Sequence, residues 1–444
     1  MAGERRPRSR GVLTRGPARD PEAALRAGAA PPILRQRSPR RTSPLDETEY
    51  PTIKILQGED RRLRGGSPWV YSNELEMDGA AKALPPGSVV RLVAPSGKVL
   101  GLAHFNPRTL IAARLLTRNK DGKIDRSFVE YRVARALALR SKLYAEPFYR
   151  LVHAEADGLP GLVVDRFGDV VVLQANTAGM AALQDEIAAA LDAVLHPEVI
   201  IARNETSSRG LEGLEGETRA LKGEIPARML VRENGIEFAA DPAGGQKTGW
   251  FYDQRHNRAF AAGLCRDQEV LDLYSYAGGF ALAAAAAGAK SVTAVDGSEA
   301  ALALARDTAG RHDGGALAGR VRFEKAEVFE LLGRQAQSKQ RYGVVIADPP
   351  AFAKSRRDLG PALKGYRKLA RGAASLVTEP GFLCIGCCSY HVSAEDFLET
   401  AWGGIREAGR GGRLLARAGA GPDHPIHPSL PESAYLKFLA FALD

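Results

Sequence analysis

Cysteine is scarce in this sequence, and long hydrophobic runs are absent from it. The 444 residues include four cysteines, which is a poor disulfide framework for so long a chain and indicates a reducing compartment, the cytoplasm. Cys384 and Cys387 make one C-x-x-C pair, but no second pair completes a zinc site, so we expect no structural metal. No stretch approaches the roughly 20 apolar residues of a membrane span, so we expect no membrane partner.

Two phosphate-binding motifs are missing as well. The turn around Gly278 reads YSYAGGFAL, which lacks the G-x-G-x-x-G pattern that seats a pyrophosphate on a helix start. It also lacks the lysine of a P-loop. Neither a dinucleotide nor a nucleoside triphosphate is the expected ligand of this turn.

The sequence does contain a strand, a glycine turn, a helix and a second strand in one run. Residues 270–273 are apolar and carry Asp272, and Gly278 lies in the turn that follows. Residues 280–287 are alanine-rich and favour a helix. Asp296 ends the second strand, 18 residues after Gly278, where an acidic side chain accepts hydrogen bonds from ribose hydroxyls. The pattern indicates a nucleoside-binding α/β domain.

S-adenosylmethionine suits this turn because it is a nucleoside ligand without a phosphate. Its amino acid part needs a carboxylate and backbone partners, and glycines let a ligand approach the backbone closely. The alternative is an ordinary doubly wound domain whose glycines only make a tight turn. The residues of this stretch leave both interpretations open.

Composition divides the chain into four parts. Residues 1–49 form a tail that we expect to be disordered, since the first 50 residues hold 11 Arg against 6 acids and little to bury. Such a tail can add non-specific affinity for a polyanion. Residues 50–118 are predicted to form a small β-barrel, residues 119–240 an α/β domain, and residues 241–444 the nucleoside-binding domain.

Local patterns predict elements within the two middle parts. In the barrel we expect strands at residues 52–56, 89–93, 99–105 and 111–116. In the central domain we expect helices at residues 126–143 and 180–195, a hairpin at residues 162–174, and a mobile loop that ends near Thr218. Candidates for phosphate contacts in the barrel are Arg61, Arg62, Arg64 and Arg114, although a solvated face also carries such side chains.

Residues 244–258 read GGQKTGWFYDQRHNR and mix aromatic with charged side chains. Such a mixture lines sites more often than it fills cores. The side chains concerned are Lys247, Thr248, Trp250, Phe251, Tyr252, Asp253 and Arg255.

Two later strand ends carry candidate chemistry. Asp348 and Pro349 follow an apolar strand, and the stiff proline backbone would hold them against the edge of a flat base on which Phe352 could stack. A turn that merely ends a strand is the weaker reading. Cys388 follows the next apolar strand, and a thiol there can attack a pyrimidine at C6, which makes C5 nucleophilic toward a methyl donor. The adjacent Cys387 leaves the identity of the nucleophile open by one residue.

From residue 50 to residue 444 the chain resembles the bacterial 23S rRNA cytosine-C5 methyltransferases of the RlmI type. The motifs that carry the resemblance are YRLVHAEADGLPGLVVDRFGD, KTGWFYDQRHNR, LDLYSYAGGF, AVDGSE, DPPAF, KGYRKL, CCSYHV and DHPIHPSLPESAYLKF. The resemblance implies a class I, Rossmann-like methyltransferase domain with a mostly parallel sheet and helices on both faces, preceded by a PUA-like RNA-binding barrel and an α/β insert domain. The Arg-rich tail lies outside the family pattern.

The resemblance also implies roles for individual residues. Cys388 is the expected nucleophile, and Asp348 positions the cytosine in a base pocket with Pro349 and Phe352. Glu327 stands where related enzymes usually have an aspartate near the adenine amine. The residues expected to bind S-adenosylmethionine are Asp272, Tyr274, Gly278, Asp296, Glu327 and Asp348.

The leading hypothesis is therefore an RNA cytosine-C5 methyltransferase that works through a covalent Cys388–C6 adduct, with an unidentified base removing the C5 proton. Two alternatives remain: a purine-nitrogen RNA methyltransferase of the same fold, and a PUA-bearing RNA-binding or assembly factor with a vestigial cofactor site. Family likeness suggests large-subunit rRNA as the partner, while the target nucleotide and a homodimer stay open. The side chains expected to hold RNA are Arg61, Arg62, Arg64, Lys354, Arg356 and Arg357.

Overall fold

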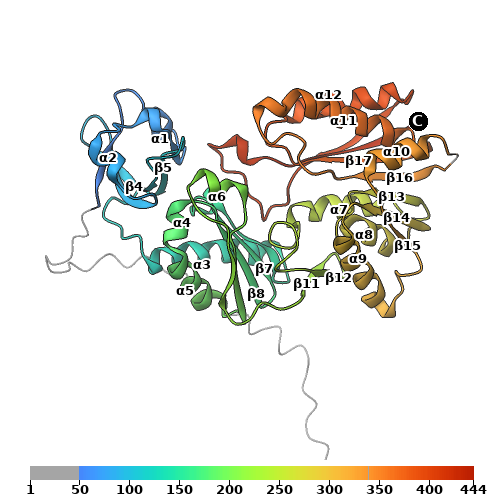
Figure 1. The fold of residues 1–444 in the computed structure, drawn as a ribbon, viewed down its shortest axis with the longest axis horizontal. Coiled ribbons are helices and arrows are strands. Elements are labelled where there is room, and N and C mark those ends of the chain that lie inside the picture. The colour runs from blue at the N-terminus through green and yellow to red at the C-terminus, as the bar shows by residue number, and fades with distance from the viewer. Residues whose placement is uncertain (1–49, 339) are drawn as a thin grey trace, which may run out of the picture. The chain divides into compact units, whose positions relative to one another are not determined.

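Four β-sheets organise residues 50–338 and 340–444, which are the residues that this computed structural model describes (Figure 1). The expectations for residues 1–49 lie outside the described residues. None of the helices in the described ranges combines the length and the apolar character needed to cross a membrane.

The first sheet has five strands in the order β1-β3-β4-β5-β2. Its strands are β1 (Thr52–Lys54), β2 (Trp69–Val70), β3 (Ser88–Val93), β4 (Val99–Phe105) and β5 (Ala113–Thr117), accompanied by helices α1 (Arg61–Arg64) and α2 (Gly79–Ala83). The strands predicted at residues 89–93 and 99–105 are confirmed as β3 and β4, which pair antiparallel as a hairpin. Gly97 makes its turn with φ +84°, a left-handed backbone that glycine adopts without strain.

The second sheet also has five strands, in the order β10-β9-β8-β7-β6. Its strands are β6 (Phe148–His153), β7 (Leu162–Phe167), β8 (Val170–Ala175), β9 (Val199–Arg203) and β10 (Thr218–Lys222). The hairpin predicted at residues 162–174 is confirmed by the antiparallel pairing of β7 with β8. Its helices are α3 (Arg126–Leu143), α4 (Ala178–Ala182), α5 (Gln184–Leu195) and α6 (Ser207–Leu211).

Two expectations for this region are corrected. The helix predicted at residues 180–195 is interrupted at Leu183, whose backbone leaves the helical region. Burial explains the break, since Gln184 is 8% exposed and accepts a hydrogen bond from Asn204 at 2.8 Å. The stretch before Thr218 holds α6 rather than an open loop, and its Arg209 donates to the carbonyl of Glu215 at 2.8 Å.

A two-stranded hairpin and a seven-stranded sheet complete the fold. The hairpin pairs β11 (Met229–Glu233) with β12 (Ile236–Ala240). The seven-stranded sheet has the order β15-β14-β13-β16-β17-β19-β18, in which β19 runs antiparallel to both of its neighbours and the other pairs are parallel. Its strands are β13 (Glu269–Leu273), β14 (Ser291–Asp296), β15 (Val321–Lys325), β16 (Tyr342–Ala347), β17 (Val377–Cys387), β18 (Gly412–Ala418) and β19 (Lys437–Leu443).

Helices cover both faces of the seven-stranded sheet, as Figure 1 shows. One face packs on α7 (Arg255–Gly263), α8 (Gly279–Ala286) and α9 (Glu299–Arg311). The other packs on α10 (Val328–Ala336), α11 (Leu359–Ala374) and α12 (Ala394–Glu407). This arrangement is the predicted Rossmann-like α/β fold, and it brings the carboxyl ends of the five parallel strands to one edge.

Candidate active site

A cavity of about 300 Å³ lies where the parallel strands of the seven-stranded sheet end. The residues that line it after β13, β14, β15, β16 and β17 are Tyr274, Ser275, Tyr276, Asp296, Gly297, Ala326, Glu327, Val328, Asp348, Pro349, Pro350 and Cys388. The residues that line it from elsewhere are Gln246, Lys247, Trp250, Phe251, Asp253, Gln254, Arg258, Gly279, Phe280 and Leu436. The crevice outside the carboxyl ends of parallel strands is where open α/β sheets bind ligands.

The structure brings most of the predicted site residues together. Those that line the cavity are Tyr274, Asp296, Glu327, Asp348, Pro349 and Cys388. Asp272, Gly278 and Phe352 do not line it. Phe352 packs on the ring of Tyr366 instead, with 4.5 Å between the ring centroids.

Asp296 holds the turn after β13 in shape. One of its carboxylate oxygens accepts a hydrogen bond from the backbone N–H of Tyr276 at 2.9 Å, and the other accepts from Ser298 N–H at 2.8 Å. Tyr276 has φ +48°, an uncommon backbone conformation for a non-glycine residue. Asp296 therefore fixes the turn at the end of its own strand while its side chain faces the cavity.

Asp272 and Gly278 support the cavity wall from behind. Asp272 is fully buried, and its Oδ2 accepts from Ala281 N–H at 2.9 Å, at the start of α8. Burial, and next the nearby Asp348, raise the pKa of Asp272 well above its ordinary value. Gly278 has φ +79°, and a Cβ there would lie 2.9 Å from the Cβ of Ala305, so helix α9 packs where a side chain would be.

Several buried polar atoms at the end of β13 have no partner among the described residues. They are the hydroxyls of Tyr274 and Ser275 and the Oδ1 of Asp272. Such atoms are rare in folded proteins and are usually satisfied by a ligand or water. Glu327 lies nearby and caps helix α10, since its Oε2 accepts from Glu330 N–H at 2.9 Å. The donor and acceptor set of this wall fits a nucleoside with an amino acid tail.

Asp348 is held at the other wall. Its Oδ1 accepts from the Gln254 side-chain amide at 2.8 Å. A Cβ on Gly386 would come within 2.5 Å of that same oxygen, so the carboxylate occupies the space that a side chain on β17 would fill. Burial, with a further contribution from Asp253, raises the pKa of Asp348 to about 7. At neutral pH this carboxyl therefore holds a proton much more readily than an ordinary aspartate does.

The two adjacent cysteines have different surroundings. Cys388 lines the cavity, and its Sγ lies 3.7 Å from the carbonyl oxygen of Pro349. Cys387 is fully buried among the apolar side chains under α11 and α12. Burial, and next the charge of Asp348, raise the pKa of the Cys388 thiol to about 12, whereas Lys247 opposes that shift.

Some side chains of the segment before α7 line the cavity, and others contact the second sheet. Lys247 and Asp253 face the cavity and form an ion pair of 3.0 Å. Thr248 donates to Asp165 in the second sheet, and the hydroxyl of Tyr252 donates to the carbonyl of Arg166 at 2.8 Å. The expectation that this segment lines a site therefore describes about half of its side chains.

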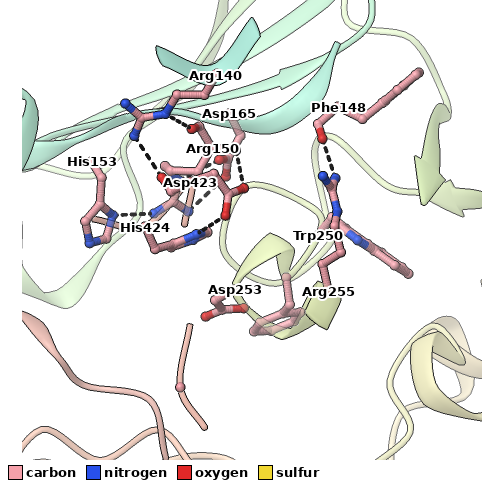
Figure 2. A network of polar contacts seen from close by, with 12 residues as sticks. Arg140, Phe148, Arg150, His153, Asp165, Trp250, Asp253, Arg255, Asp423 and His424 are labelled. Carbon is pink, nitrogen blue, oxygen red and sulfur yellow. Dashed lines mark hydrogen bonds and ion pairs between the residues drawn. The ribbon is translucent and has the colours of Figure 1, made fainter. Parts of the chain in front are cut away.

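A network of buried charges connects the second sheet to the segment before β19 (Figure 2). Arg140 donates to both carboxylate oxygens of Asp157 at 2.6 and 2.8 Å, and Arg150 to both of Asp165 at 2.5 and 3.0 Å. Asp423 joins the two pairs. Its backbone carbonyl accepts from Arg140 at 2.8 Å, and its Oδ2 accepts from the backbone N–H of Arg150 at 3.0 Å.

The predicted RNA-binding side chains fall into two groups. In α1, Arg62 pairs with Glu74, and Arg64 pairs with Asp60 at 2.6 Å. Arg114, the other basic candidate of the first sheet, pairs with the buried Glu212 at 2.8 Å, so its charge is neutralised inside the protein. Past Pro350, exposed cationic side chains form no ion pair with any described residue: Lys354, Arg356 and Arg357.

Sequence patterns missed several residues of the cavity, including Gln254, Arg258 and Tyr276. Arg258 is almost fully buried and donates to both oxygens of Glu233 at 2.6 and 2.7 Å. These residues lie within the segment 244–258 or the LDLYSYAGGF motif, but no local pattern marks them individually, because the role of each depends on a partner in another element. Among the residues that the structure describes, no cluster of three or more His, Cys, Asp or Glu side chains could hold a metal ion.

Family models match two parts of the chain. Residues 215–441 match the model described as S-adenosylmethionine-dependent methyltransferase, and residues 53–118 match a PUA-like domain. Two proteins called ribosomal RNA large subunit methyltransferase I are similar over 391 residues each. The protein from Shewanella denitrificans is 36% identical and that from Alteromonas mediterranea 35%, in both cases over 87% of this chain and over 98% and 97% of theirs.

Solved structures share the fold. A protein described as a SAM-dependent methyltransferase from Streptococcus mutans matches 88% of this chain and all of its own, with a TM-score of 0.74 and 21% identity. SMU.776, described as a methyltransferase complexed with SAH, covers the same share with a TM-score of 0.75 and 22% identity.

Proposed function

Because the chain belongs to the S-adenosylmethionine-dependent methyltransferases of the ribosomal RNA large subunit methyltransferase I family, we propose that it methylates C5 of a cytosine in large-subunit rRNA. The observation that carries this proposal is the shared cavity. A thiol, a carboxyl of raised pKa and a wall of unpartnered polar atoms all belong to the same space or to its immediate backing. A ribosomal substrate agrees with the cytoplasmic location that the cysteine usage indicates.

The wall at the end of β13 and β14 would hold the cofactor. Asp296 would accept from the ribose hydroxyls, and Ser275 and Tyr274 would use their hydroxyls on the remaining polar groups. Asp272 and Gly278 would act through the backbone of the turn. Glu327 would face the adenine of the cofactor. When bound, S-adenosylmethionine supplies an electrophilic methyl group. On the opposite wall, Asp348, Pro349 and Cys388 would bind the target base and make its C5 nucleophilic.

Asp348 and Pro349 would hold the target base. The cytosine must leave its stack to reach this cavity. A protonated Asp348 can donate a hydrogen bond to N3, and the Pro349 carbonyl can accept from the exocyclic amine. Both contacts recognise cytosine, and the proton near N3 withdraws electrons from C6. Stabilising charge where it develops is the largest contribution in many enzymes.

Cys388 would then attack C6. Its thiol resists ionisation because of burial and because of the neighbouring Asp348 charge. The thiol proton would pass to the Asp348 carboxylate, which removes that charge and supplies the hydrogen bond to N3, so the sulfur would attack C6 as thiolate. C5 of the resulting adduct becomes nucleophilic and accepts the methyl group. Cys387 is fully buried, which favours Cys388 as the nucleophile.

The two alternatives predict different products. Methylation of a purine nitrogen needs no cysteine, and the thiol in the cavity has no role in it. A binding factor with a vestigial cofactor site would have no reason to keep unpartnered polar atoms at the cofactor wall. Incubation with unmodified rRNA, nuclease digestion and mass spectrometry of the nucleosides would test the proposal. We expect 5-methylcytidine, and a methylated purine or an absence of methylation would refute it.

The remaining parts of the chain would serve the RNA. The PUA-like segment and the exposed Lys354, Arg356 and Arg357 of the catalytic domain would contact the backbone around the flipped base, and residues 119–240 would connect the PUA-like segment to the catalytic domain. Specificity for one nucleotide would then depend on the shape of the RNA. A homodimer stays a possibility from the sequence alone, and light scattering of the purified protein would decide it.

A further inference from the structure

One carboxylate oxygen in the cavity is left without a partner. Asp253 is 2% exposed and lines the cavity together with Cys388 and Asp348. Its Oδ2 accepts from Lys247 Nζ at 3.0 Å and from the hydroxyl of Tyr435. Its Oδ1 has no hydrogen-bond partner among the described residues. A buried carboxylate that uses only one of its oxygens has a lone pair available for a ligand or a proton.

The other ionisable groups of the cavity have other roles. Arg258 and Lys247 are cations held by carboxylates. Asp296 receives two backbone N–H groups, and Glu327 caps a helix at the cofactor side. Asp348 is expected to carry a proton when it binds N3. These assignments leave Asp253 as the free acceptor on the side of the nucleophile.

We propose that Asp253 is the base that removes the C5 proton of the methylated cytosine adduct. The inference rests on the proposed function. In this step the C5–H bond breaks and its proton passes to Oδ1 of Asp253. The electron pair of that bond forms the C5–C6 double bond. The C6–Sγ bond breaks with its electrons on sulfur, so Cys388 leaves as thiolate and 5-methylcytosine is released.

The surroundings of Asp253 keep it in the acceptor form. Burial opposes its ionisation, but Lys247, His424 and the hydroxyl of Tyr435 outweigh burial and hold the pKa of Asp253 well below its ordinary value. The carboxylate is thus ionised wherever the enzyme works. Lys247 and Tyr435 contact only Oδ2, so they fix the orientation of the carboxylate and leave Oδ1 without a protein donor.

The variant Asp253→Asn tests the assignment. The asparagine oxygen can still accept from Lys247 and Tyr435, whereas the amide at the Oδ1 position cannot accept a proton. We expect the variant to attack and methylate RNA but to release product about 10²- to 10⁴-fold more slowly, the range that general-base catalysis contributes. A Cys388-dependent protein–RNA adduct should therefore accumulate on ordinary RNA. With C5-tritiated cytosine, the adduct should keep its tritium.

Wild-type protein on RNA containing 5-fluorocytidine is the reference, because fluorine at C5 cannot leave as a proton. A wild-type adduct on this RNA shows that the chemistry of the proposed function holds, and its absence would refute that function rather than the role of Asp253. Asp192→Asn is the matched control. Asp192 also pairs with a lysine, Lys222 at 2.6 Å, but on the exposed surface, so its variant should turn over like wild type.

Two results would overturn the assignment. One is turnover of Asp253→Asn within about tenfold of wild type without an adduct. The other is failure of the variant to form an adduct even on 5-fluorocytidine RNA while it still binds S-adenosylhomocysteine in calorimetry, since the carboxylate would then act before methylation. If the variant does not bind the cofactor product, Asp253→Ala with added formate replaces it, and a lack of faster release with formate would equally refute the proposal.

Discussion

The active-site cavity and the ion pairs Arg140–Asp157 and Arg150–Asp165 of the network both contain buried charge, but they differ in how completely that charge is hydrogen-bonded. In the network, the guanidinium groups of Arg140 and Arg150 each contact a carboxylate through two hydrogen bonds, and each makes at least one further polar contact. In the cavity and its backing wall, Asp253, Asp272 and Ser275 each keep a polar atom without a protein partner. The doubly hydrogen-bonded ion pairs of the network stabilise the fold. The unpartnered polar atoms of the cavity and its backing wall can bind a ligand.

The difference has an energetic reason. An unsatisfied buried polar group costs about 1 to 3 kcal/mol, and in the cavity a bound ligand can recover that free energy. Buried ion pairs are tolerated when the geometry is good, and removing one partner is strongly destabilising. Substitutions in the cavity should therefore impair activity while sparing stability, and substitutions in the network should do the reverse.

Cys388→Ala should give the largest effect on the cavity side. Loss of the proposed nucleophile should reduce methyl transfer by about 10³-fold or more. Stability should change little, because the contact of the thiol with the Pro349 carbonyl, at 3.7 Å, is weak. Methyl incorporation from labelled cofactor measures the first quantity and urea unfolding the second. Cys387→Ala is the control and should stay within about tenfold of wild-type activity. Equal activity of both variants would assign the chemistry to another group.

Asp165→Asn should give the largest effect on the network side. It leaves the Arg150 charge buried without its ionic partner, which typically costs about 3 to 5 kcal/mol of unfolding free energy. Arg126→Ala is the control, since Arg126 pairs with Glu130 on an exposed helix surface, where a pair is worth less than about 1 kcal/mol. Urea unfolding followed by circular dichroism compares the two. Similar losses in both variants would mean that the network does not stabilise the fold.

Asp348→Asn should raise the free energy of unfolding, whereas Asp165→Asn lowers it, and the gain should appear only at higher pH. The folded-state pKa of about 7 lies above the unfolded value of about 3.9, so ionisation of Asp348 destabilises the folded protein. Wild-type stability should fall as pH rises from about 4 to about 7. The variant lacks this loss and should be more stable by up to a few kcal/mol above pH 7, with no gain at pH 4. A gain that is independent of pH would contradict this account.

Neutralising the exposed basic side chains should give the smallest effect, and this effect should be confined to the binding of RNA. Replacing Lys354, Arg356 and Arg357 should flatten the salt dependence of RNA binding by about one unit of log-log slope per lost phosphate contact. Replacing the α1 trio, Arg61, Arg62 and Arg64, should flatten it less, since two of its three charges already pair within the protein. Titrations at several salt concentrations would measure both slopes, with cofactor affinity unchanged. If replacing the α1 trio flattens the salt dependence more than replacing Lys354, Arg356 and Arg357 does, the main RNA contact lies at α1.

Sequence patterns predicted what depends on neighbours along the chain. The β13–α8–β14 unit follows from alternating apolar runs, a glycine turn and alanine-rich helix residues, and parallel strands then place Asp296, Asp348 and Cys388 at one edge. They did not predict contacts between distant segments. The bond from Tyr435 to Asp253 joins residues 182 positions apart. Phe352 was expected in the base pocket because it follows Pro350, but packing on Tyr366 holds it elsewhere.

The same distances along the chain set an order for folding. The hydrogen bond from Tyr276 to Asp296 closes a loop of 20 residues, whereas that from Tyr435 to Asp253 closes one of 182. Loop closure becomes less favourable with length, and non-local contacts form slowly. We therefore expect the wall at the end of β13 and β14 to form first. The contacts that position Asp253 should form last. A chain still in the course of folding would then acquire affinity for its cofactor before it acquires the means to release a modified base.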